Sequence, residues 1–91
     1  MNYKEKYLDH FSLTKADFIY CEYSWIVKRV MVKAENIHHI EHGANKNDDI
    51  ENLMAVSYEV HQLAHDEKLV NSRYHLKAVH ETFLKENPYD L

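Results

Sequence analysis

The chain has 91 residues and a mass of 10.9 kDa, which is enough for one small domain spanning residues 1–91. Apolar residues make up 45% and charged residues 29%, a balance that excludes gross disorder. The longest apolar runs have only four residues and the first residues lack an apolar signal core, so we expect a cytoplasmic protein without a membrane span. A single cysteine excludes an internal disulfide framework.

The net charge of −4 argues weakly against a nucleic-acid partner, but the charges are unevenly distributed. Residues 23–33 contain Lys28, Arg29 and Lys33 and no acid. Residues 34–66 contain seven acids and one base, together with five of the eight histidines. Eight histidines are many for this length, and their positions carry most of the functional information.

The first half of the chain predicts a helix followed by strands. Residues 3–11 repeat apolar side chains at helical spacing, and residues 17–33 are rich in β-branched and aromatic residues, which predicts two strands or a hairpin. Residues 36–41 predict a strand with Ile37 and His39 on one face and His38 and Ile40 on the other. Residues 42–49 contain the only glycine and predict a loop.

The second half predicts one more strand and two helices. Residues 53–56 read as a short strand, after which Ser57 can cap a helix that runs to about residue 66. Asn71 or Ser72 can cap a last helix that ends before Pro88. On that helix one apolar face is expected to hold Leu76, Val79, His80 and Phe83. The predicted fold class is therefore α+β, with a short β-hairpin flanked by N- and C-terminal helices.

Histidines occur at spacings that suit a metal site. His61 and His65 are four residues apart and project from one face of a helix, which suits a divalent metal. A third histidine from the adjacent pair His38–His39 would complete a three-histidine site with open positions, and the other one could act as general base. Surface histidines at such spacings are common by chance, and we assign His10, His42 and His75 to the solvated surface. A zinc-protease site is excluded because Gln62 stands where a catalytic glutamate is required.

The order of these residues resembles the HNH endonuclease motif, the ββα-metal nuclease finger. The resemblance covers residues 18–66, with a core motif at 36–66, and rests on Ile37-His38-His39-Ile40, Glu51-Asn52-Leu53-Met54-Ala55, and His61 with His65. It implies that His39 is the general base, that Asn52 orients it, and that His38, His61 and His65 bind one divalent metal ion (Mg, Mn, Ni or Zn). The implied activity is metal-dependent hydrolysis of phosphodiester bonds in DNA.

Many HNH proteins also carry a structural zinc held by two CxxC pairs. Cys21 matches the first of these positions, but Ser24, Ser57 and Val60 stand where the other three cysteines would be. One thiolate cannot hold zinc, so we expect that this metal is lost and that Trp25, Tyr58 and Val60 fill the space.

The basic residues Lys28, Arg29 and Lys33 are candidates for DNA phosphate contacts, with a solvated strand edge as the equally plain alternative. Weak sequence preference is expected, since no helix is rich in groove-reading side chains, and a protein partner could supply specificity. Acidic residues such as Glu35, Glu41 and Asp66 are expected to raise nearby histidine pKa values. Two other functions remain open: a non-catalytic HNH-like interaction module that binds a protein partner, and a structural metal protein.

Overall fold

The fold, seen in a computed structural model, is described for residues 1–65 and 72–90. It is α+β, with a two-stranded antiparallel sheet and flanking helices, which confirms the expected class. The main elements are α1 (Tyr3–His10), β1 (Asn36–His39), β2 (Leu53–Val56), α2 (Tyr58–His65) and α3 (Ser72–Glu86). Three short turns join them: the π-helical η1 (Ser24–Lys28) and the 3₁₀ segments η2 (Gly43–Asn45) and η3 (Ile50–Asn52).

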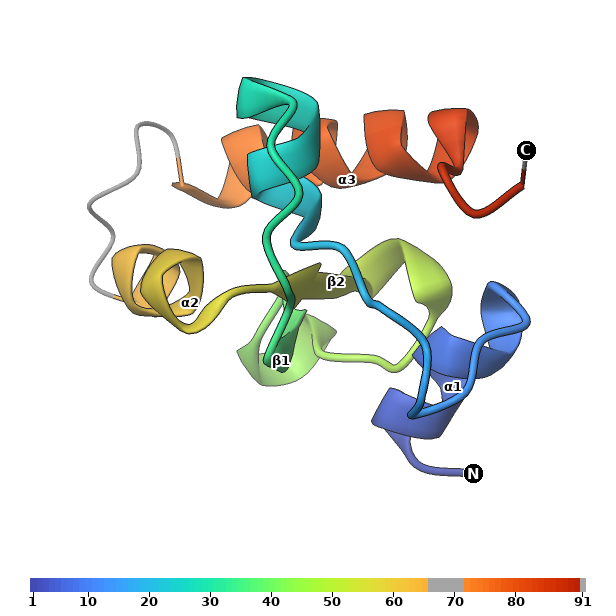
Figure 1. Ribbon diagram of the computed structural model, residues 1–91. Helices are drawn as coiled ribbons and strands as arrows, with labels where there is room; N and C mark the ends of the chain where they lie inside the picture. Colours follow the sequence, from blue (N-terminus) through green and yellow to red (C-terminus); the bar gives the residue numbers. More distant parts are fainter. Residues whose placement is uncertain (66–71, 91) are drawn as a thin grey trace.

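The two strands form the centre of the molecule, with α2 at one end, α1 at the other and α3 across one side (Figure 1). Their register pairs His38 with Met54 and His39 with Leu53. Strand β2 is buried along its whole length, because both of its faces are covered. Side chains alternate across β1 as expected, so Ile37 and Ile40 enter different apolar clusters.

The core consists of two apolar clusters on either side of β2. One gathers around Cys21, Ile40, Met54, Val56, Val60, Leu76 and Val79, and the other around Tyr7, Phe11, Ala34, Leu53, Ala55 and Phe83. Both use the inner face of α3, where all four predicted residues, including His80, are buried. Helix α3 therefore contacts both clusters and packs across the sheet.

Residues 17–33 do not form the two strands or the hairpin that the sequence predicts. Only one bridge, Tyr20 with Lys33, joins the ends of this segment, and η1 lies between them. β-propensity reflects packing on a pleated surface more than a backbone preference, so tertiary packing can override it. Here the helical turn directs both Trp25 and Ile26 into the core, whereas a strand would point them to opposite faces. Arg29, with φ of 55°, ends the turn in the left-handed region.

The region around Cys21 is packed differently from our expectation. Val60 is buried beside Cys21 in one cluster, as predicted, and the Ser24 hydroxyl donates to Cys21 Sγ at 3.3 Å. Tyr58, however, is 58% exposed, and Trp25 packs in the other cluster. The prediction was wrong for Tyr58 because it is the first residue of α2 and points away from the core.

The N-terminal cap of α2 is confirmed. The backbone N–H of Val60 donates to the Ser57 hydroxyl at 3.3 Å, which places Ser57 at the cap position. Residue 66, the expected end of this helix, and Asn71, a candidate cap of α3, lie outside the described residues.

Candidate metal and catalytic site

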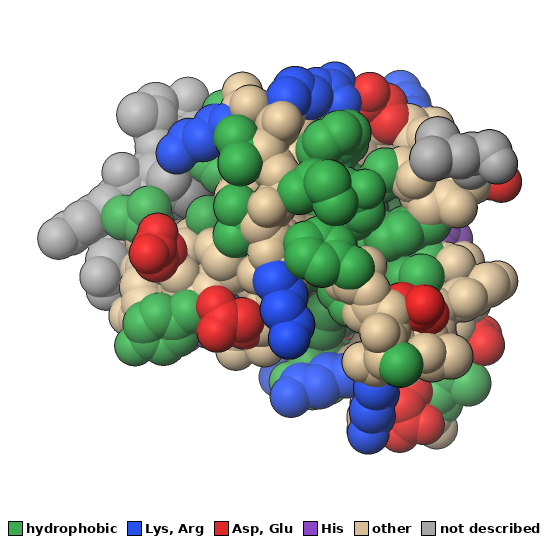
Figure 2. Space-filling model, viewed as in Figure 1, with side chains coloured by type: hydrophobic (Ala, Val, Ile, Leu, Met, Phe, Trp, Pro, Cys, Tyr) green, Lys and Arg blue, Asp and Glu red, His purple; other side chains and the backbone are tan. Residues whose placement is uncertain are grey.

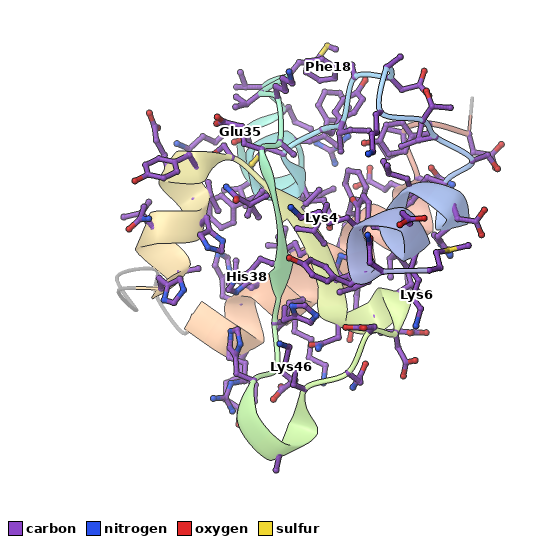
Figure 3. The ribbon with its side chains drawn as sticks, turned by 90° about the horizontal axis from the view of Figure 1, so that it is seen from below. Lys4, Lys6, Phe18, Glu35, His38 and Lys46 are labelled. Carbon is purple, nitrogen blue, oxygen red and sulfur yellow. The ribbon has the colours of Figure 1, made fainter. Side chains whose placement is uncertain are left out.

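Four histidine side chains form a row between β1 and α2. The ring of His38 lies 5.2 Å from that of His61, and the His61 ring lies 5.2 Å from that of His65, measured between centroids. His42, just after β1, adds a fourth ring 5.4 Å from His38. Figure 3 shows His38 on the side of β1 that faces α2. The strand therefore brings His38 to the helix face from which His61 and His65 project.

The environment of this row favours the neutral form of His38, His42 and His61. Burial, and then the neighbouring His61, His42 and His65, lower the pKa of His38 from 6.5 to about 4. Burial and the same mutual repulsion lower the pKa values of His42 and His61. The neutral imidazole is the form that binds a metal ion.

The expectation that acids raise these pKa values was wrong in direction for those three histidines. Glu35 instead accepts a hydrogen bond from the Tyr58 backbone at 3.3 Å, and Glu41 lies 3.7 Å from Arg73. Both carboxylates are thus directed to other partners, while the histidines repel one another. Asp66 lies outside the described residues.

Two features of the row bear on whether it could hold a metal ion. Two imidazoles that share one tetrahedral metal have centroids about 5 Å apart at the usual metal–nitrogen distance. Nδ1 of His61 is shielded from solvent and has no hydrogen-bond partner among the described residues. In its present rotamers, this part of the chain brings no three His, Cys, Asp or Glu side chains around one point. Coordination by all three candidate ligands would therefore require their rings to turn.

His39, the candidate general base, lies on the opposite face of β1. Its Nε2 is 2.8 Å from Asp48 Oδ1, and the ring of Tyr3 packs against it with centroids 4.7 Å apart. A carboxylate accepts hydrogen bonds, so Nε2 carries the proton, and in the neutral ring Nδ1 is left to accept one. His39 also contributes to the lowered pKa values of His38 and His42, after the burial of those groups. The candidate base and the histidine row thus lie on opposite faces of β1.

Asn52 fixes the loop that follows His39. Its Oδ1 accepts from the Glu41 backbone N–H at 2.6 Å, and its Nδ2 donates to the carbonyls of Asn47 and Glu41 at 2.8 and 3.3 Å. Asn52 is 5% exposed, so these bonds are shielded from water. Together they tie the end of η3 to the loop that carries Asp48, and thus hold the partner of His39.

The three basic candidates lie in different surroundings. Arg29 makes a two-pronged ion pair with Glu86 at 3.0 and 3.1 Å and lies over the Trp25 ring. Lys28 is exposed at the end of η1. Lys33 lines a pocket beside β1. The structure thus brings Lys33, but not Arg29, to an open basic surface.

Two groups of residues escaped the sequence interpretation. Asp48 was not singled out, although it follows His39 by nine residues in the one predicted loop. Glu22 and His80 meet in the core across 58 residues of chain, a separation that leaves no local signal. Only the placement of His80 on a helix face that is otherwise apolar hinted that it is buried.

No protein-family model, curated protein sequence or solved structure matches this chain. Within the described residues, none of the helices has the length and apolar character needed to cross a lipid bilayer.

Proposed function

We propose that this protein is a metal-dependent endonuclease of the ββα-metal (HNH) type that hydrolyses phosphodiester bonds in DNA. The observation that carries this proposal is the row of His38, His61 and His65 between a hairpin strand and the helix that follows the hairpin. The next residue on the strand, His39, is held by a carboxylate, as a general base needs to be. The proposed ligand His38 and the proposed base His39 thus occupy adjacent positions on β1.

The proposed ligands of one divalent metal ion are His38, His61 and His65. Imidazole suits Zn and Ni well, whereas Mg prefers oxygen ligands, and Mn lies between them. When bound, the ion supplies Lewis-acid stabilisation of the negative charge that develops on the phosphate during hydrolysis. His42 lies at the end of the row and is exposed.

Proton transfer is assigned to His39. Its Nδ1 would take a proton from the attacking water, while Asp48 keeps Nε2 protonated and stabilises the imidazolium that forms. Asn52 keeps the Asp48 loop in place through its three hydrogen bonds. Asp48 and Asn52 are both positioning residues in this proposal. DNA recognition would involve Lys28 and Lys33 and would depend little on sequence.

Nicking of supercoiled plasmid tests the proposal. The wild-type protein should nick in the presence of Mn²⁺, Ni²⁺, Zn²⁺ or Mg²⁺, and EDTA should stop the reaction. His39→Ala should abolish nicking but keep metal affinity in isothermal titration, whereas His61→Ala should lose both. His10→Ala, an exposed histidine on α1, is the matched control. Absence of nicking by the wild type with all four ions would refute the nuclease.

A non-catalytic module that binds a protein partner is the second candidate. It is favoured by the exposed apolar side chains of Phe18, Val27, Val30 and Met31, which are 43–59% exposed. Figure 2 shows a hydrophobic area over η1 and the chain beside it. Patches of this kind often bind proteins. Wild-type protein that never nicks DNA, but loses a partner on Met31→Ser substitution, would favour this function.

A further inference from the structure

A pocket with an apolar floor and a basic rim opens between α1 and the chain that leads into β1. Its volume is about 230 Å³. The floor is formed by Leu8, Ile19 and Ile37, and the rim includes Lys4, Lys15 and Lys33. Figure 3 shows Lys4 between α1 and β1, and Figure 2 shows Lys and Arg side chains gathered at the lower middle of the same region.

The positive charge of this pocket is not neutralised by salt bridges. None of the ion pairs among the described residues includes a lysine. The pocket also contains two acids, but both are engaged within the protein: Asp17 accepts two hydrogen bonds from Thr14, at 2.7 and 3.2 Å, and Glu35 accepts one from the Tyr58 backbone. Both carboxylates keep their negative charge, so the three ammonium groups leave the pocket with an excess of one positive charge, which favours an anion.

Lysines continue from this pocket toward the candidate base. The hydrogen bond from His39 lowers the pKa of the Asp48 carboxyl, and Lys6 on α1 and Lys46 after η2 lower it further. Figure 3 shows Lys6 near α1 and Lys46 on the loop beyond β1. A phosphate chain bound at the pocket would find further cations on the side of β1 where His39 lies.

We propose that this pocket binds one nucleotide of a single-stranded nucleic acid, with its base on the apolar floor and its neighbouring phosphates on Lys4, Lys15 and Lys33. The inference rests on the proposed nuclease function, for which it names the substrate as single-stranded. A base can enter an apolar pocket only when it is unstacked from its neighbours. In a duplex this would also break a base pair, whereas in a single strand no pair has to be broken. The volume lies below the ~300–1,000 Å³ of most small-molecule sites, so it suits a base alone, with the sugar and the phosphates outside the pocket.

Fluorescence anisotropy in EDTA tests the pocket independently of any metal. The probes are labelled oligothymidylate and a duplex of equal length. The full-length protein should bind the single strand more tightly than the duplex. The double variant Lys4→Ala/Lys33→Ala should weaken single-strand binding by about tenfold and reduce the salt slope by roughly 0.7 for each lost contact. The control variant Lys77→Ala/Lys85→Ala changes two exposed lysines on α3, and it should leave both the single-strand affinity and the salt slope unchanged.

Equal losses for the two double variants, or tighter binding of duplex, would overturn the inference. So would thymidine monophosphate that competes as well as the oligonucleotide, since the site would then take free nucleotides. Failure of the pocket proposal can be distinguished from failure of the nuclease proposal. If His61→Ala abolishes nicking while the lysine variants bind normally, the nuclease stands and the pocket fails; if only the lysine result is obtained, the pocket stands and the nuclease fails.

Discussion

Nδ1 of His80 on α3 lies 2.5 Å from Oε1 of Glu22, and both side chains are completely buried. The other ring nitrogen of His80 lies 2.6 Å from the Ile50 carbonyl oxygen, so this nitrogen must carry a proton. The second Glu22 oxygen accepts from the Ala55 backbone N–H at 3.1 Å and from the Tyr7 hydroxyl. One buried carboxylate thus joins α1, β2 and α3.

His80→Gln should destabilise the protein. Loss of the cation leaves the Glu22 carboxylate buried without its partner, which costs about 3–5 kcal/mol for pairs of this kind. Urea denaturation at pH 6 would measure the loss. His10→Gln, at an exposed position, is the control and should change the free energy of unfolding very little. A loss below about 1 kcal/mol would show that His80 and Glu22 are not an ion pair.

The contribution of His80 should depend on pH. Burial by itself lowers the His80 pKa, but the hydrogen bond and the charge of Glu22 outweigh burial and raise this pKa above 6.5. A raised pKa stabilises the fold fully below the unfolded value near 6.5, and that stabilisation is lost as the pH rises through the folded value. The difference in unfolding free energy between wild type and His80→Gln should therefore be larger at pH 6 than at pH 9. An equal difference at both pH values would contradict this assignment.

Asp48→Asn should slow DNA nicking by on the order of 10- to 100-fold, the usual effect of losing the partner that orients a functional histidine. An amide cannot stabilise the imidazolium as a carboxylate does, so His39 becomes a weaker base. Metal affinity in isothermal titration should stay unchanged. Asp49→Asn, one residue further along, is the matched control, because its carboxylate makes no hydrogen bond among the described residues. Equal nicking by the two variants would count against the role of Asp48.

Asn52→Ala should lower the free energy of unfolding by about 1–3 kcal/mol, since it leaves buried backbone groups of the loop without partners. It should also slow nicking, because the Asp48 loop loses its attachment to η3. Thermal unfolding and plasmid nicking measure the two effects. Asn36→Ala is the control for the stability measurement alone, because Asn36 lines the proposed nucleotide pocket but makes no side-chain hydrogen bond within the described part of the chain. Stability equal to that of the control would show that the loop holds itself.

Cys21→Ser should leave the zinc content of the protein unchanged and lower its stability by about 1–3 kcal/mol. The serine hydroxyl would be placed in an apolar cluster at a position with 0% exposure. Cys21→Ala, which adds no polar group, should cost less. Elemental analysis and urea denaturation give the two readouts. One equivalent of zinc lost on either substitution would mean that Cys21 binds a metal.

The sequence predicted those parts of the fold that local pattern determines. Alternation along 36–41 gave the two faces of β1, and Ser57 gave the start of α2. Residues 17–33 were mispredicted because aromatic and β-branched residues favour a buried surface, which a helical turn such as η1 also provides. The pattern correctly indicated that Ile19, Trp25 and Ile26 pack against the core, but it was wrong for the backbone. It was also wrong for the apolar side chains that lie exposed: Phe18, Val27, Val30 and Met31.

The candidate site was predictable only as far as short-range spacing reaches. His61 and His65 are four positions apart on a helix, so their shared face follows from helix geometry. The contacts of His39 with Tyr3 and Asp48 depend on how α1 and the loop pack against β1, and packing at that level leaves no periodic trace. The predicted direction of the histidine pKa shifts was wrong for a related reason. The distance between charged groups in space decides the direction of a pKa shift, and their order along the chain does not.

The residues after α3 return to the core. Tyr89 accepts a hydrogen bond from the Tyr20 backbone at 2.8 Å, and its ring packs against Phe11, Tyr20 and Phe83. Shortening the chain after Glu86 would remove this ring from a cluster that also contains Tyr7, the partner of Glu22. An affinity tag or fluorescent label is therefore better attached before Met1 than joined closely behind Tyr89, and digestion by a carboxypeptidase should lower the melting temperature as soon as it passes that residue.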